Sequence, residues 1–94
     1  MALEVSSTNE PMRAACADVF ESWIELASDR LAAAGLSRAR SRKLAVSMLC
    51  SLEGAFVLAR AMRSTEPLKA AAAAAAQDVR EALREPAARR RRPA

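Results

Sequence analysis

The sequence contains no histidine and no tyrosine, and only two glycines. Without histidine, the chain cannot assemble the ligand shell that transition metals usually occupy in proteins. The sequence also shows no nucleophile–base pair and no phosphate-binding loop. These absences argue against a small helical enzyme, so we expect no catalytic residue, no cofactor and no metal.

Large apolar side chains are also scarce, with two Phe and one Trp in 94 residues. Hydrophobic residues still make up 52% of the chain, because much of the apolar content is alanine. This length allows one small domain with a thin core. The low Gly and Pro content favours a compact helical protein over a linker.

The net charge of +4 arises from one segment, since four consecutive arginines occupy positions 89–92. The segment 86–94 has no apolar periodicity, and we expect a basic disordered tail. Such a tail can contact nucleic acid without sequence preference. A solubilising role without any partner is the favoured interpretation.

Two cysteines, Cys16 and Cys50, fall inside predicted helices. The first ten residues lack the basic and apolar regions of a signal peptide. Reduced thiols and a cytoplasmic location are therefore expected. Glu53 divides the longest apolar run, from which we expect no transmembrane span and no membrane contact.

Capping residues and helix breakers predict an all-α fold of three antiparallel helices within residues 10–85. Asn9, Ser37 and Thr65 are the expected N-caps. The expected ends are Ala34 before Gly35 for the first helix, Arg63 for the second, and Pro86 for the third. The alanine run at 70–76 is read as helix, because alanine is the best helix former.

Residues 44–63 are apolar on opposite sides of the second helix, whereas a surface helix usually buries one stripe. Three helices cannot cover both sides, so we expect a second copy of the chain to supply the cover. Glu53 lies inside this apolar run, where a carboxylate is costly unless paired. Arg60 lies two turns further along nearly the same face, and we expect the two to meet across the interface.

Charges are grouped on the first two helices. An acidic stripe lies opposite the apolar face of the first helix, and a solvated surface is favoured over a metal or basic-partner site. The stripe consists of Asp18, Glu21, Glu25 and Asp29. A basic group opens the second helix, made of Arg38, Arg40, Arg42 and Lys43. Pairing with nearby acids, Asp29 in particular, is favoured over a phosphate-binding patch.

Four short motifs occur in order: FESW at 20–23, LAAAG at 31–35, LEGAFVLAR at 52–60 and EPL at 66–68. Together they resemble the C-terminal regulatory domain of TetR-type bacterial transcriptional repressors, over about residues 3–83. Members of that family begin with a helix-turn-helix DNA-binding domain, which has no counterpart here. Residues 1–9 are read as an extended remnant, and we expect no specific DNA binding by this chain alone.

The resemblance implies a homodimer in which the last two helices of both copies form a four-helix bundle. The interface residues that it implies are Leu49, Leu52, Glu53, Phe56, Arg60, Leu68, Ala72, Val79 and Leu83. It further implies part of a pocket for a small apolar effector, with Cys16, Phe20 and Trp23 on one wall, because the family's remaining pocket helices have no counterpart here. An alternative is a stand-alone interaction protein that forms mixed dimers with a full-length TetR-type regulator. A small helical enzyme is the less favoured alternative.

Overall fold

A computed structural model describes residues 9–86, and within that range the chain consists of helices and turns without a β-strand. The helices are α2 (Glu10–Ala33), α3 (Arg38–Met62) and α4 (Glu66–Arg84). The all-α prediction is confirmed. The expected N-terminal remnant and basic tail fall almost entirely outside the described residues.

Two of the three expected N-caps form a side-chain hydrogen bond. Asn9 Oδ1 accepts a hydrogen bond from the Met12 N–H at 3.1 Å, and Ser37 Oγ accepts one from the Arg40 N–H at 3.2 Å. Gly35 follows the first helix at φ 118°, a conformation that glycine adopts without steric cost. These local signals fix where α2 ends and α3 begins.

Thr65 is the N-cap residue of α4, as expected, but its side chain makes no capping hydrogen bond. Ser64 Oγ instead accepts a hydrogen bond from the Glu66 N–H at 3.1 Å. Arg63 ends α3 in the left-handed conformation at φ 51°, which turns the chain back toward α4.

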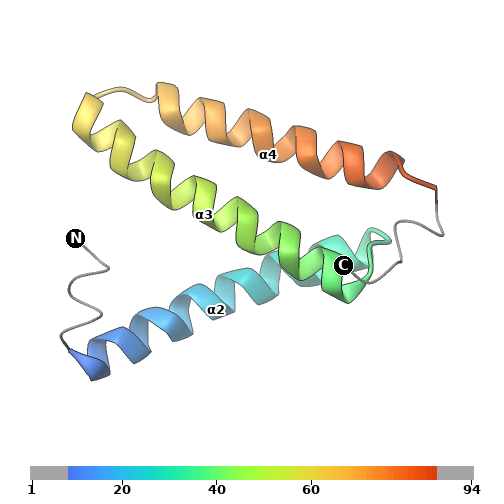
Figure 1. Ribbon diagram of the computed structural model, residues 1–94, viewed down its shortest axis with the longest axis horizontal. Coiled ribbons are helices and arrows are strands. Elements are labelled where there is room, and N and C mark those ends of the chain that lie inside the picture. Colours follow the sequence, from blue (N-terminus) through green and yellow to red (C-terminus); the bar gives the residue numbers. More distant parts are fainter. Residues whose placement is uncertain (1–8, 87–94) are drawn as a thin grey trace.

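α2 meets α3 and α4 at one end of the molecule and separates from both toward the other end, where a loop joins α3 to α4 (Figure 1). α4 runs antiparallel beside α3, whereas α2 crosses the N-terminal part of α3 and then diverges from it (Figure 1). We call the two ends the junction and the open end. α3 is the central helix, since it packs against both of the others.

The core lies at the junction. Its four buried residues are Leu31, Leu36, Ala45 and Ala82, with 2–9% of each exposed. Partly buried side chains surround them, namely Ile24, Ala27, Leu44, Val79 and Leu83. Ser41 is fully buried beside this region, and its hydroxyl has no hydrogen-bond partner among the described residues. Alanine occupies half of the buried core positions, so the core is thin, as the composition indicates.

The open end leaves large apolar side chains uncovered. Those on α3 are Leu52, Phe56, Val57, Leu58 and Met62, and those on α2 are Met12, Val19, Trp23 and Leu26. By length and composition alone, α3 is also apolar enough to cross a membrane. Length and composition are the only features of a membrane span that α3 shows, so the expectation that no helix spans a membrane stays a prediction.

Candidate functional site

An apolar cleft of about 340 Å³ lies between the three helices. Its lining residues are Trp23, Ile24, Ala27, Ala45, Met48, Leu49, Leu52, Ala71, Ala72 and Ala75. None of these side chains carries a charge, and the volume falls in the range of about 300–1,000 Å³ typical of small-molecule pockets. The cleft is suited to an apolar molecule or an apolar side chain.

Trp23 is the one member of the expected pocket wall that lines this cleft, and 49% of it is exposed. Phe20 stacks edge-on against it, with ring centroids 5.8 Å apart and planes at 65°. Phe20 and Cys16 are each half-buried on the same side of α2, but neither lines the cleft. Phe20 is therefore positioned to hold the indole ring rather than to contact a ligand.

The apolar residues of the expected interface divide into three groups. Leu49, Leu52 and Ala72 line the apolar cleft. Val79 and Leu83 pack against the core, and Leu68 is partly buried. Phe56 is 49% exposed and lies one turn beyond Leu52, on the side of α3 that faces the cleft. Their contact with a second copy stays a prediction.

Glu53 and Arg60 are both exposed within one chain. No ion pair joins them or links either to another residue in the described range of 9–86. An exposed carboxylate keeps its hydration, so Glu53 carries no burial cost in the single chain. The expected pairing across an interface stays a prediction.

A second exposed surface lies on α3 away from α2, and we call it the outer face. It consists of Lys43, Ser47, Cys50, Gly54, Val57 and Leu58, all exposed. Val57 and Leu58 are 69% and 53% exposed. Beyond the neighbouring backbone of α3, a Cβ added at Gly54 would meet no atom of the described residues within 4 Å. The outer face is therefore open along most of the helix.

Arginines at the start of α3 tie the junction together. The expected contact between Arg38 and Asp29 is confirmed, with 2.5 Å between Nη1 and Oδ1. Arg42 adds two hydrogen bonds to Glu21, at 2.5 and 3.0 Å. These bonds hold the pKa of the Glu21 carboxyl below its usual value. The acidic stripe is thus not simply a solvated face, since two of its members bind α3.

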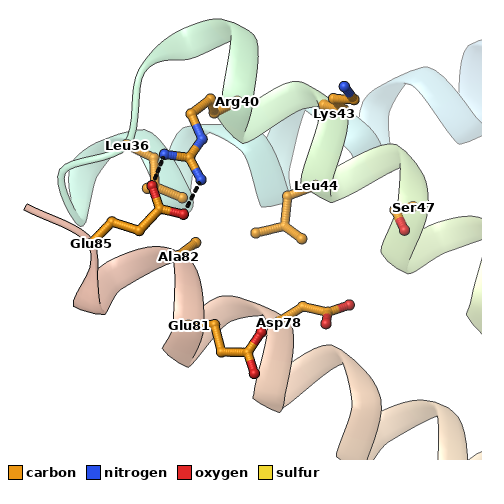
Figure 2. A pocket seen from close by; sticks show the side chains of 9 residues that line it. All are labelled: Leu36, Arg40, Lys43, Leu44, Ser47, Asp78, Glu81, Ala82 and Glu85. Carbon is orange, nitrogen blue, oxygen red and sulfur yellow. Dashed lines mark hydrogen bonds and ion pairs between the residues drawn. The ribbon is translucent and has the colours of Figure 1, made fainter. Parts of the chain in front are cut away.

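Arg40 forms the longest-range of these contacts. Its Nη1 and Nη2 atoms lie 2.6 and 3.0 Å from the carboxylate oxygens of Glu85, just beyond α4 (Figure 2). The pair is bidentate and partly buried, which is the stronger arrangement for an arginine and a carboxylate. Sequence reasoning missed Glu85 and Glu21 as partners, because neither lies near its arginine in sequence.

A polar cleft of about 430 Å³ lies beside this ion pair, between α3 and α4. Figure 2 shows Lys43 and Ser47 along α3 and Asp78 and Glu81 along α4, with the Arg40–Glu85 pair at one end. Leu36, Leu44 and Ala82 also line it. The cleft therefore carries opposite charges on its two walls.

Residues 1–74 match the family model for the C-terminal domain of LmrA/YxaF-like transcriptional regulators. Rv0196 and MT0206, uncharacterized HTH-type transcriptional regulators from two strains of Mycobacterium tuberculosis, are each 41% identical over 58 residues. That match covers 62% of this chain and 30% of each relative.

The HTH-type transcriptional regulator LmrA of Bacillus subtilis is 26% identical over 68 residues, covering 72% of this chain and 36% of LmrA. The chain thus spans about a third of the length of these curated relatives. No solved structure matches significantly. The matching proteins are regulators rather than enzymes. The family model covers most of the chain, and the chain belongs to the LmrA/YxaF-like TetR family of transcriptional regulators, of which it carries the C-terminal domain.

Proposed function

We propose that this chain is a dimerisation and effector-binding domain of a transcriptional regulator acting in the cytoplasm. A small apolar effector binds in the cleft lined by Trp23, and a second copy of the chain packs against the outer face. The single observation that carries the proposal is the division of the exposed apolar residues into these two separate surfaces.

The effector side rests on the chemistry of the cleft. Its lining combines one indole ring with aliphatic and thioether groups, and it is open enough for a ligand to enter. Burying apolar surface contributes roughly 25 cal/mol per Å², which favours an apolar ligand over a charged one. Trp23 belongs to α2 and Leu52 to α3, so a ligand between them would hold the diverging helices at one separation.

The dimer side rests on the outer face of α3. Val57 and Leu58 are large, apolar and largely exposed, and no residue of the described range 9–86 covers Gly54. Contiguous exposed apolar surface is typical of protein interfaces. Pairing two α3–α4 hairpins through this face gives a four-helix bundle. In this arrangement Leu49, Leu52 and Ala72 belong to the effector cleft rather than to the dimer contact.

Effector binding is tested with Nile red, an uncharged apolar dye whose fluorescence rises on burial. Ala72→Phe adds a ring where the cleft lining is small, so it should fill the cleft and abolish most of the dye signal. Ala73→Phe places the same ring on the adjacent α4 position outside the lining, and it should leave the signal unchanged. Equal dye binding by both variants would reject the cleft as the site.

The dimer surface is tested with a matched pair of charge substitutions on α3. Leu58→Asp on the outer face should convert the dimer to monomers in sedimentation equilibrium at micromolar concentration. Phe56→Asp on the cleft side should keep the dimer and weaken Nile red binding. Dissociation by Phe56→Asp alone would instead support the interface that the sequence implied. A monomeric wild-type chain would reject the dimer altogether.

A further inference from the structure

One of the four basic residues that open α3 is left without an acidic partner. Arg38, Arg40 and Arg42 pair with Asp29, Glu85 and Glu21. Lys43 forms no ion pair with any residue of the described range, and its side chain is exposed. It stands at the N-terminal end of the outer face.

The opposite wall of the polar cleft carries unpaired charge of the other sign. Asp78 and Glu81 lie one turn apart on α4 and are exposed. Glu81 accepts a hydrogen bond from the Gln77 amide at 2.8 Å, but neither acid forms an ion pair within residues 9–86. All three residues line the same cleft, with these acids on α4 and Lys43 on α3 (Figure 2).

We infer that these charges fix the register of the proposed dimer, with Lys43 of each copy opposite Asp78 and Glu81 of the other. The inference rests on the proposed function. A two-fold axis parallel to the helices places α3 of one copy beside α4 of the other. Rotation about this axis leaves the position of every residue along the axis unchanged. Lys43 and Asp78 line one cleft, so the two residues lie at about the same position along the axis. The symmetry then forms the contact twice.

The alternative stacking is disfavoured by the same charges. A two-fold axis perpendicular to the helices would lay α3 on α3 in opposite directions. Lys43 would then face the apolar C-terminal part of the partner helix, near Leu58 and Met62, and the acids would face the alanine run. Each charge would lose water without gaining a partner, which is costly. Charge complementarity therefore selects a second copy in the parallel-axis register.

Charge reversal tests the register. Lys43→Glu alone, or Asp78→Lys with Glu81→Lys, should each raise the dimer dissociation constant about tenfold, because two attractive contacts become repulsive. Equimolar mixing of these variants should restore wild-type affinity. Native mass spectrometry should find mixed dimers well above the one-half share that random association gives. Lys69→Glu, on an exposed lysine of α4, is the control and should leave the dissociation constant unchanged.

The outcomes separate the register from the dimer itself. If Lys43 pairs with its own Asp78 or Glu81 in solution, each reversal weakens one chain internally and mixing restores nothing, which overturns the inference. A wild-type dimer whose affinity neither reversal changes overturns it as well. A wild-type chain that stays monomeric rejects the proposed function first. Rescue by mixing that fades at high salt supports the register, since salt screens exposed charges.

Discussion

The junction and the open end of the molecule are built from the same three helices but differ in how they are held. At the junction, Leu36 and Ala45 are 4% and 2% exposed, and arginines of α3 reach acids on both neighbouring helices. At the open end, Phe56 and Leu58 are half-exposed on opposite sides of α3. The difference indicates that the chain's own packing is concentrated at the junction, while the apolar side chains of the open end stay exposed.

The largest expected effect comes from shortening a buried side chain at the junction. Leu36→Ala should lower the free energy of unfolding by about 2–3 kcal/mol, because it removes apolar contacts and leaves a cavity. Leu58→Ala at the open end should change it little in dilute solution and should weaken the dimer instead. Urea denaturation at two protein concentrations measures both. If both variants lowered the free energy of unfolding equally at every protein concentration, the junction and the open end would not differ in how they are stabilised.

Breaking the partly buried ion pair should come next. Arg40→Ala leaves the Glu85 carboxylate without its two hydrogen bonds and should cost about 1–2 kcal/mol of unfolding free energy. Arg13 makes a comparable contact with Glu10, but in the exposed first turn of α2. Arg13→Ala should therefore shift the thermal midpoint much less. A larger shift from Arg13→Ala would mean that the junction is not where stability resides.

Gly54→Ala should act with opposite signs on the single chain and on the dimer. Alanine is favoured over glycine in a helix interior by about 1 kcal/mol, and the added methyl meets open space in one chain. Dilute chains should therefore become more stable. The same methyl should weaken the dimer in sedimentation equilibrium, because the proposed interface would bring the partner helix close to Gly54. Tighter dimerisation would show that Gly54 lies outside the contact.

The smallest effect is a pH dependence at the junction. The hydrogen bonds from Arg42 lower the pKa of Glu21 from its ordinary value of 4.5. A carboxyl whose pKa is lower in the folded state stabilises the fold above pH 4.5, and this contribution is lost as the pH falls through the folded pKa. Thermal melting of the wild type should show this acid loss, and Glu21→Gln should reduce it. The change should be small, because the pair is exposed.

Sequence reasoning succeeded where the signal is local. Asn9 and Ser37 cap helices through side chains three residues from their partners, and Asp29 meets Arg38 across a short turn. Thr65 takes the expected N-cap position without a side-chain bond, and the adjacent Ser64 hydroxyl accepts the hydrogen bond from the Glu66 N–H. Two neighbouring hydroxyl residues compete for one N–H, and propensity alone does not rank them.

The sequence alone could not predict that the exposed apolar residues of α3 form two separate surfaces. Helical periodicity groups Leu49, Leu52 and Phe56 on one side, but it does not say which element faces them. The angle at which α2 leaves α3 decides that, and packing at the junction sets the angle. For the same reason Arg40 and Glu85, 45 residues apart, were not expected to meet.

The Arg40–Glu85 pair also changes how the α3–α4 hairpin opens. The chain joins the two helices at one end through residues 63–65, and the ion pair joins them at the other. The hairpin is thus closed at both ends, by the covalent chain at one end and by the ion pair at the other. A terminal helical turn is ordinarily the first to exchange its amide hydrogens with solvent. Here the last turn of α4 should exchange nearly as slowly as the first turn of α3, until the loss of Arg40 breaks the ion pair.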